Sequence, residues 1–389
     1  MEVYGKQNLI VTTLKGLEEV LEKEINSMGI EGTEAINRGV SIPYSQRNLY
    51  QVNMAARVAL RVLVPVFQFE AESTEDLYEQ AIKFPWDKFQ NIDQTFAIYN
   101  AVNSSIFTHA QYASLKMKDA LCDAFRKTHQ RRPDVDTYRP DIVWHLHIYE
   151  KKVTISLGSS GESLHLRGYR KGSHGAPINE VLACGLLYLS GWDSNITPFV
   201  DGMTGSGTIA IEAAMMATRR APNLNRKNFA FKNWLDYNDD LFQDIKTDLV
   251  QRTKSLIPDI LGIDISPRAI ETAELHAKLA GVKKFVRFRK GDFLDYKPEK
   301  SKGVLLLNPP YGERMEEEDL ELLYKEMGTN FKHSFPGWRV GVISSSKSAM
   351  NAIGLSSAET FHLLNGKLEC DFKLYDMFEG KKKKMSDLE

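Results

Sequence analysis

The chain has 389 residues and 42% of them are hydrophobic, so it exceeds the usual length of one domain and can bury more than one core. Lysine and arginine number 50 against 51 aspartates and glutamates, which gives a net charge of −1. An anionic partner must therefore be held by a local basic patch, because the field of the whole molecule does not attract one.

The three cysteines, Cys122, Cys184 and Cys370, are far apart in the chain and lack the spacing of metal ligands. They predict free thiols in a reducing compartment and no metal site. No stretch approaches the roughly 18–20 apolar residues of a membrane span, and the amino terminus lacks the features of a signal peptide. We expect a cytoplasmic protein without a membrane partner.

Residues 1–70 predict a small α+β domain. A β-rich segment at 8–12 is followed by apolar residues at helical spacing from 14 to 28. A second helix near 48–57 and an apolar strand at 60–69 complete the set. This order of elements predicts a ferredoxin-like domain.

Residues 71–161 predict a second α+β domain. Ser73, with Asp76 three residues later, is typical of a helix start. The elements expected after that short helix are a strand from 96, a long helix at 108–127, and strands at 142–149 and 153–157.

Basic charge gathers in and just beyond this second domain. Residues 103–173 contain 12 lysines and arginines against 7 acids, with aromatic residues between them. Such a mixture can neutralise phosphates and stack bases, although composition alone equally favours a solvated face whose charges pair locally. The candidate RNA-binding residues are Phe107, Lys116, Arg126, Lys127, Arg131, Arg132, Arg167, Arg170 and Lys171.

Residues 162–380 predict an α/β domain with a doubly wound sheet, because helices and strands alternate. Strands are expected at 197–201, 259–264, 285–288 and 303–307, and helices at 178–190, 206–219 and 267–280. Closely spaced strands at 339–343, 360–364 and 369–375 suggest an antiparallel hairpin at one edge. Residues 381–389 begin with four lysines and are expected to be disordered.

A glycine-containing loop follows the first strand of this domain. It reads Gly202-Met203-Thr204-Gly205-Ser206-Gly207-Thr208, and its glycines let the backbone approach a ligand closely. A dinucleotide fingerprint would need a third glycine where Ala210 stands and an acid about twenty residues later, and both are missing. The candidate cofactor contacts here are Asp201, Gly202, Thr204, Gly205, Gly207 and Thr208.

Acidic residues follow the next two strands. Asp264, with Ile265 beside it, ends a strand, where its carboxylate can accept both hydroxyls of a ribose. Asp292 is placed to accept from an adenine amino group, and Phe293 to pack on the adenine ring. Helix capping by Asp264 and a simple turn at Asp292 are the alternative uses.

The fourth strand ends in Asn308-Pro309-Pro310-Tyr311, the candidate catalytic residues. An amino group on a heteroaromatic ring is a poor nucleophile, so a site that alkylates it must restore electron density by accepting its protons. The side-chain oxygen of Asn308 and the carbonyl of Pro309 can do so, the two prolines hold the turn rigid, and Tyr311 offers a ring for stacking.

The ordered set of strand-end motifs resembles class I S-adenosylmethionine-dependent methyltransferases that act on nucleobase amino groups. Nearly the whole chain is similar to bacterial methyltransferases with a THUMP domain, in particular the 23S ribosomal RNA guanine-N2 enzymes. The segments that carry this resemblance are 107–113, 160–170, 176–180, the glycine loop and 308–315. The resemblance implies a ferredoxin-like domain, an RNA-binding THUMP domain and a seven-stranded Rossmann-like catalytic domain, with S-adenosylmethionine as cofactor and the basic stretch functional.

Two departures from the family pattern stand out. Gly202 and Thr204 replace a proline and a cysteine, which predicts a looser first turn and puts cofactor affinity in question, and His276 replaces an asparagine. Guanine-N2 methylation of ribosomal RNA is the expected activity. The alternatives are guanine-N2 methylation of transfer RNA, adenine-N6 methylation, and a non-catalytic RNA-binding assembly factor.

Overall fold

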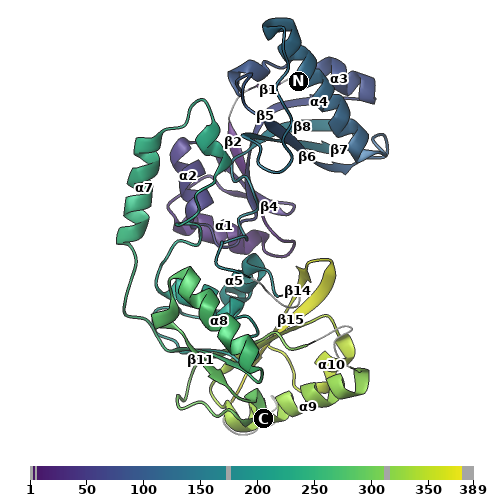
Figure 1. Ribbon diagram of the computed structural model, residues 1–389. Helices are drawn as coiled ribbons and strands as arrows, with labels where there is room; N and C mark the ends of the chain where they lie inside the picture. The colour runs from purple at the N-terminus through teal and green to yellow at the C-terminus, as the bar shows by residue number, and fades with distance from the viewer. Residues whose placement is uncertain (1–2, 5–6, 172–176, 311–315, 379–389) are drawn as a thin grey trace. The chain divides into compact units, whose positions relative to one another are not determined.

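The computed structural model describes residues 3–4, 7–171, 177–310 and 316–378 (Figure 1). The tail expected to be disordered, 381–389, lies outside these residues. The chain forms two compact units: unit 1 comprises 1–13, 21–164 and 225–248, and unit 2 comprises 14–20, 165–224 and 249–389. In the described ranges, each helix is too short or too polar to cross a membrane.

Unit 1 is built on one mixed sheet with the strand order β3-β4-β2-β5-β8-β7-β6, and β1 also pairs with β5. Its strands are β1 (Val3–Tyr4), β2 (Asn8–Thr12), β3 (Glu34–Ile36), β4 (Gly39–Pro43), β5 (Arg61–Glu70), β6 (Phe96–Asn103), β7 (Ile142–Tyr149) and β8 (Lys152–Gly158). Its helices are α1 (Glu18–Ser27), α2 (Gln46–Ala55), α3 (Thr74–Ala81), η1 (Trp86–Lys88), α4 (Ala110–His129) and η2 (Ala230–Asn233).

Strand β5 joins the two expected α+β domains into this sheet. Its first residues pair with β2, and from Leu63 onward it pairs with β8, with a bulge between Pro65 and Phe67. Helix α3 begins as predicted: the Ser73 hydroxyl accepts from the Asp76 backbone N–H, and the Asp76 carboxylate accepts from the N–H of residue 72.

Unit 2 contains a seven-stranded sheet with the order β11-β10-β9-β12-β13-β15-β14. Its strands are β9 (Phe199–Asp201), β10 (Ile260–Asp264), β11 (Arg287–Lys290), β12 (Val304–Leu307), β13 (Arg339–Ser344), β14 (Glu359–Asn365) and β15 (Leu368–Asp376). Its helices are α5 (Glu180–Leu189), α6 (Thr208–Ala217), α8 (Pro267–Ala280), η3 (Lys283–Phe285), η4 (Phe293–Asp295), α9 (Glu317–Ser334) and α10 (Lys347–Ala352), while α7 (Asp239–Gln251) connects the units in sequence.

The sheet of unit 2 is parallel except for β15, which runs antiparallel to both of its neighbours. Helices α6 and α8 contact β9, β10 and β11. A buried cluster that contains Leu305, Val340, Tyr324 and Phe331 packs α9 against β12 and β13. The prediction of a Rossmann-like seven-stranded domain with an antiparallel hairpin at one edge is confirmed.

Candidate active site

Three strands of unit 2 bring their carboxyl ends to one edge of the sheet. Asp201, the last residue of β9, lies opposite Gly262 of β10 and Leu306 of β12. The turns that follow these strands therefore meet at the same edge, which is where open α/β sheets bind their ligands. This edge holds the glycine loop, Asp264 and the Asn308 turn.

The glycine loop needs its glycines for two different reasons. Gly207 has φ +85° and lies so close to α8 that a Cβ atom would stand 2.8 Å from the Cβ of Ala273. Gly205 has φ +52°, and a Cβ atom there would meet nothing within 4 Å. The loop thus packs tightly against helix α8 at Gly207. At Gly205 it leaves open space for a ligand.

The side chain of Asp201 fixes the glycine loop through hydrogen bonds. Its side chain is fully buried, and its Oδ2 accepts from the Thr204 hydroxyl at 2.7 Å and from the Ala210 N–H at 3.2 Å. Burial raises the pKa of this carboxyl to about 7, although the bond from Thr204 acts in the opposite direction. Its Oδ1 is buried and has no hydrogen-bond partner in the described part of the chain.

The expectation of a looser first turn is wrong. The Gly202 N–H donates to the Leu306 carbonyl at 3.0 Å, a bond that a proline could not make. A Cβ atom at Gly202 would stand 2.8 Å from the ring of Phe293, so the glycine also permits close packing. The Thr204 hydroxyl adds the bond to Asp201, and the Thr204 N–H donates to Ile263 at 2.8 Å. Both replacements therefore fix the turn to its surroundings.

Asp264 ties two strand-end turns together. Its Oδ2 accepts from the Gly205 N–H at 2.8 Å and its Oδ1 from the Ser266 N–H at 2.9 Å. The cap of helix α8 is Ser266, whose hydroxyl accepts from the Ala269 N–H, so Asp264 is not the residue that caps the helix. Ile265 is 68% exposed beside it and offers apolar surface at this edge.

The two residues after β11 have different surroundings. Asp292 is exposed and accepts from the Leu294 N–H at 2.9 Å, which caps the short helix η4. Phe293 is 2% exposed, and its ring stacks on Phe335 with centroids 5.7 Å apart. The expectation that the Phe293 ring packs on a ligand needs correction, because the hydrophobic core already covers it.

The Asn308 turn begins directly after β12. The Oδ1 atom of Asn308 is buried and has no hydrogen-bond partner within the described residues. The Pro310 carbonyl accepts from the Tyr324 hydroxyl at 3.4 Å, and that hydroxyl also donates to Ser344 at 2.9 Å. Helix α9 and strand β13 thus support the turn. Tyr311 lies outside the described residues.

Comparison with known proteins identifies this arrangement. A profile of the RMKL-like methyltransferase domain matches residues 167–373, more than half of the chain. The chain belongs to this family. Profiles of the THUMP domain and of the RlmL ferredoxin-like domain match residues 71–158 and 8–63, respectively.

Solved structures agree with this family assignment over nearly the full length. The structure of SMU.472 in complex with SAH is 27% identical, with a TM-score of 0.87, and covers 97% of this chain and 100% of that chain. A possible methylase from Clostridium difficile 630 is 30% identical, with a TM-score of 0.88 and the same coverage. A predicted N6-adenine-specific DNA methylase from Listeria monocytogenes is 28% identical, with a TM-score of 0.85, and covers 96% of this chain and 97% of that chain. This RMKL-like protein is an S-adenosylmethionine-dependent methyltransferase that carries a THUMP domain.

The sheet edge that holds the glycine loop, Asp264 and the Asn308 turn fits S-adenosylmethionine. The strand-end turns of this edge hold three buried side-chain oxygens that lack hydrogen-bond partners among the described residues: Asp201 Oδ1, Ser206 Oγ and Asn308 Oδ1. Ser206 directly follows Gly205, where a Cβ atom would meet open space. Buried polar atoms without partners are rare in folded proteins, and a ligand that donates hydrogen bonds would satisfy them.

His276 is a site residue that the sequence did not reveal. The ring is fully buried, and its Nδ1 lies 3.1 Å from the Ser206 carbonyl of the glycine loop. Its Nε2 lies 3.2 Å from the backbone N–H of Lys171. One tautomer, with the proton on Nδ1, satisfies both contacts. This histidine therefore links the glycine loop to residue 171.

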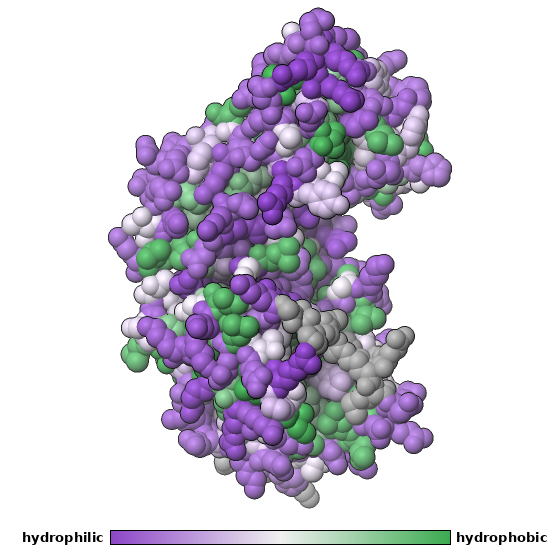
Figure 2. Space-filling view, viewed as in Figure 1, coloured by the Kyte–Doolittle hydropathy of each residue, from purple (hydrophilic) through white to green (hydrophobic). Residues whose placement is uncertain are grey.

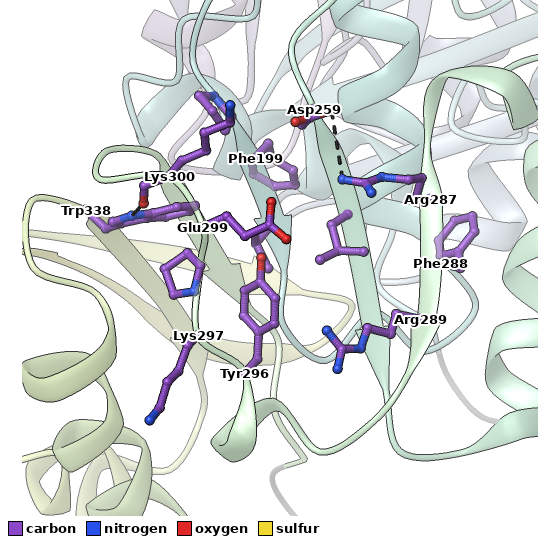
Figure 3. A pocket seen from close by; sticks show the side chains of 14 residues that line it. Phe199, Asp259, Arg287, Phe288, Arg289, Tyr296, Lys297, Glu299, Lys300 and Trp338 are labelled. Atoms are coloured by element: carbon purple, nitrogen blue, oxygen red, sulfur yellow. Dashed lines mark hydrogen bonds and ion pairs between the residues drawn. The ribbon is translucent and has the colours of Figure 1, made fainter.

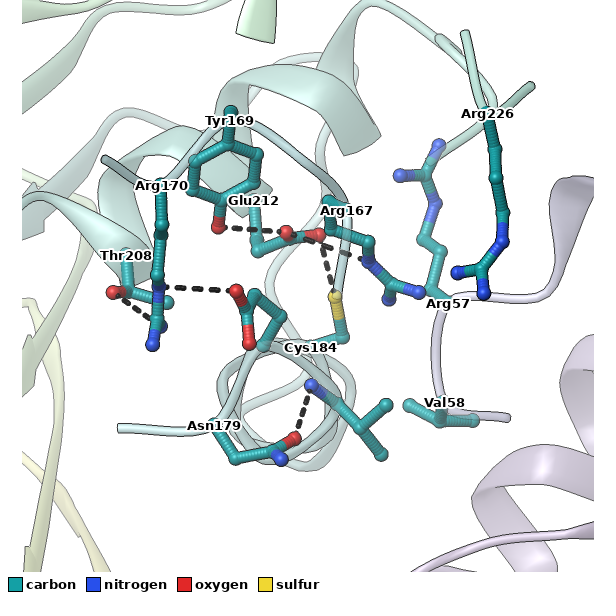
Figure 4. A network of polar contacts seen from close by, with 12 residues as sticks. Arg57, Val58, Arg167, Tyr169, Arg170, Asn179, Cys184, Thr208, Glu212 and Arg226 are labelled. Carbon is teal, nitrogen blue, oxygen red and sulfur yellow. Dashed lines mark hydrogen bonds and ion pairs between the residues drawn. The ribbon is translucent and has the colours of Figure 1, made fainter. Parts of the chain in front are cut away.

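Two predicted RNA-binding arginines form ion pairs with buried carboxylates of unit 2 (Figure 4). The buried Arg167 forms an ion pair with Glu212, and the Tyr169 hydroxyl donates to the same carboxylate at 3.0 Å. Arg170 pairs with Glu180 at 3.0 Å and donates to the Thr208 hydroxyl at 2.9 Å.

This network requires three corrections. Arg167 is buried and cannot reach RNA, the partly exposed Arg170 is held by Glu180 and Thr208, and the Thr208 hydroxyl serves the network rather than a cofactor. Burial raises the pKa of Glu180 to about 7, while Arg170 lowers it. Lys171, the next residue, is exposed.

The remaining candidates lie in the THUMP region. Phe107 is 3% exposed, so the expectation that its ring stacks on RNA is wrong. Lys116 pairs with Glu75, Arg126 with Asp123, and Arg131 with Asp93. Lys127 and Arg132 are exposed near the end of α4. Exposed ion pairs are weak, so the paired residues can exchange a carboxylate for a phosphate.

Proposed function

We propose that this protein transfers a methyl group from S-adenosylmethionine to the exocyclic N2 amino group of a guanine in RNA, with 23S ribosomal RNA as the expected substrate. The observation that carries the proposal is the buried Asn308 Oδ1, which has no hydrogen-bond partner among the described residues and stands in a turn with two prolines at the carboxyl edge of the sheet. An amine whose lone pair is delocalised needs such an acceptor.

Asn308 and Pro309 activate the amino group by accepting its two protons as hydrogen bonds. S-adenosylmethionine supplies a sulfonium-activated methyl group, and transfer to the nitrogen releases S-adenosylhomocysteine and one proton. That proton becomes acidic as the nitrogen is alkylated and leaves to water, so no strongly shifted general base is needed. The Tyr324 contact to Pro310 keeps the turn in place while this happens.

Asp264 and Ile265 are proposed to hold the ribose and the adenine of the cofactor, with Asp292 accepting from the adenine amino group. The carboxylate of Asp264 already connects the glycine loop to the start of α8, so a ribose would exchange for the Gly205 N–H or share the carboxylate with it. Asp201 serves the loop through Oδ2 and leaves Oδ1 for a donor.

The two amino-terminal domains favour RNA as the substrate. The THUMP match supports RNA binding, and the resemblance of the sequence to 23S ribosomal RNA enzymes is the reason for proposing ribosomal RNA rather than transfer RNA. Lys116, Arg126, Lys127, Arg131, Arg132 and Lys171 are the proposed phosphate contacts. Adenine-N6 methylation is the second candidate, because the Listeria protein is described as a predicted N6-adenine-specific DNA methylase and the same turn can polarise either amino group.

The proposal can be tested by product analysis. The protein is incubated with methyl-labelled S-adenosylmethionine and either ribosomal RNA, transfer RNA or DNA from a strain that lacks its gene. Each nucleic acid is then digested and the labelled nucleoside is identified. The expected product is N2-methylguanosine from ribosomal RNA. N6-methyladenine, or label in DNA alone, would contradict the proposal.

A further inference from the structure

The amino ends of the catalytic strands form a second pocket, with a volume of about 270 Å³ (Figure 3). Its lining includes Phe199 at the start of β9, Asp259 just before β10, and Trp338 just before β13. Parallel strands all point the same way, so this pocket is at the opposite edge of the sheet from the Asn308 turn. It is separate from the methyl-transfer site.

The lining of this amino-edge pocket includes the aromatic residues Trp338 and Tyr296, which are held by packing and hydrogen bonding. Trp338 is 3% exposed, and its indole N–H donates to the Lys300 carbonyl at 2.9 Å. A Cβ atom at Gly303 would stand 2.5 Å from this indole ring, so the chain approaches it closely. Tyr296 also lines the pocket, and the centroid of its ring lies 6.2 Å from that of Phe335. The segment that contains residues 296–300 is therefore anchored.

The wall of the pocket is basic. Arg287 and Arg289 alternate along β11 and so point to the same face of the strand, and both line the pocket with Lys297 and Lys300. The acids in the lining are Asp259, 3.9 Å from Arg287, and Glu299. Residues 283–302 as a whole contain eight lysines and arginines against three acids. This is a denser surplus of positive charge than that of the THUMP region.

Tyr296 has charged side chains of both signs around it. Burial raises the pKa of its phenol, Glu299 and Asp259 raise it further, and Arg287 and Arg289 lower it. Figure 3 shows the Tyr296 hydroxyl below Glu299 and the Arg289 side chain beside the Tyr296 ring. A phosphate alone would be repelled by Glu299. A ribonucleotide has phosphate for the arginines, a base for the aromatic ring, and hydroxyl or amino donors for the carboxylate.

The position of the pocket suits a strand of RNA that also reaches the catalytic edge. In the described part of the chain, β11 is the last strand at its end of the sheet. It has four residues, so the two edges are separated by only about 13 Å along it. The face of the protein in Figure 2 is mainly hydrophilic, with hydrophobic residues in small separate groups.

We propose that the amino-edge pocket binds a single-stranded nucleotide of the RNA substrate, with its phosphate at Arg287 and Arg289, its base against Tyr296, and its 2′-hydroxyl at Glu299. The proposal rests on the proposed function only in taking RNA as the occupant.

The test compares Arg287→Gln/Arg289→Gln with a matched control, Lys325→Gln/Lys332→Gln, which removes the same charge from exposed positions of α9. The probe is a fluorescein-labelled 20-nucleotide single-stranded RNA, measured by anisotropy across a series of salt concentrations. Loss of two phosphate contacts should weaken binding roughly tenfold or more at low salt and reduce the salt slope by about 1.4. The control should change affinity less than about twofold, since it removes no contact to the probe. Unchanged SAH affinity in both proteins shows that unit 2 is folded.

A second variant tests the hydroxyl contact. Glu299→Ala should reduce the preference for RNA over DNA of the same sequence, because position 299 then has no side-chain oxygen to accept from a 2′-hydroxyl. Unchanged RNA affinity and salt slope in the double arginine variant would overturn the proposal. The proposal would also be overturned if the double arginine variant bound a labelled polyglutamate peptide with changed affinity but bound RNA with unchanged affinity. If the parent protein binds this RNA through the pocket but methylates none of the nucleic acids, the proposed function fails and the pocket assignment stands.

Discussion

Replacing Asp201 by Asn should change how the stability of unit 2 depends on pH. The pKa of this buried carboxyl is about 7 in the folded protein against a usual value of 3.8. Between these two values the unfolded chain ionises while the folded protein keeps its proton. The stability that the protonated group contributes is therefore complete below pH 3.8 and is lost as the pH rises through 7.

The size of this effect follows from the shift in pKa. A difference of about 3 pH units corresponds to about 4 kcal/mol of unfolding free energy, or roughly 10 °C in the melting temperature of a domain of this size. Asn cannot ionise, so Asp201→Asn should remove this pH-dependent loss. The melting temperature of the variant minus that of the parent should rise by this amount between pH 4 and pH 8.

The assay is thermal unfolding of the cofactor-free parent and variant across this pH range. Other titrating groups, such as Glu180, are present in both proteins and cancel in the difference. Asp292→Asn provides the matched control, because Asp292 is an exposed carboxylate at the same edge. If the melting temperature of Asp201→Asn minus that of the parent stays constant with pH, the reasoning is refuted.

Three further substitutions test the site. Thr204→Val removes the 2.7 Å bond to Asp201 and should cost about 1.5–3 kcal/mol of stability and weaken SAH binding, whereas Thr204→Ser should keep both; equal effects of the two changes would contradict this. Gly202→Pro removes the donor to Leu306 and should lower the free energy of unfolding by about 1–3 kcal/mol from crowding alone, measured as a lower melting temperature; a more stable variant would contradict the packing account. Asn308→Ala should reduce methyl transfer by about 10²–10³-fold while SAH affinity, measured by calorimetry, stays within about twofold. Equal loss of turnover and SAH binding in folded Asn308→Ala protein would disprove its assignment to the amino group.

The features predicted well from the sequence are those set by local chemistry. A hydroxyl three residues before an acid identified the start of α3, and strand-end motifs in a fixed order identified the sheet, because each strand of a doubly wound fold delivers its motif to the same edge. Helices α7 and α9 were not anticipated. Both are largely polar, and α9 buries only part of its surface against β12 and β13.

The features predicted poorly depend on partners far away in the sequence. Arg167 looks like a surface cation until Glu212 is placed beside it, and a phenylalanine such as Phe107 can stack on a base or fill a core. The role of His276 depends on two backbone groups that are 70 and 105 residues distant. Gly202 and Thr204 looked like losses because they were compared with the proline and cysteine of the family pattern, and the sequence does not show the bonds that they make.

The central claim is that the methyl donor and the target amino group meet at the Asn308 turn. A crystal structure of the protein with SAH tests this most directly. The account predicts the ribose at Asp264, the ligand over Gly205, and the sulfur within a few ångströms of the Asn308 side-chain oxygen. SAH bound at another edge of the sheet, or the Asn308 oxygen turned away from the ligand and bonded to the protein itself, would contradict it.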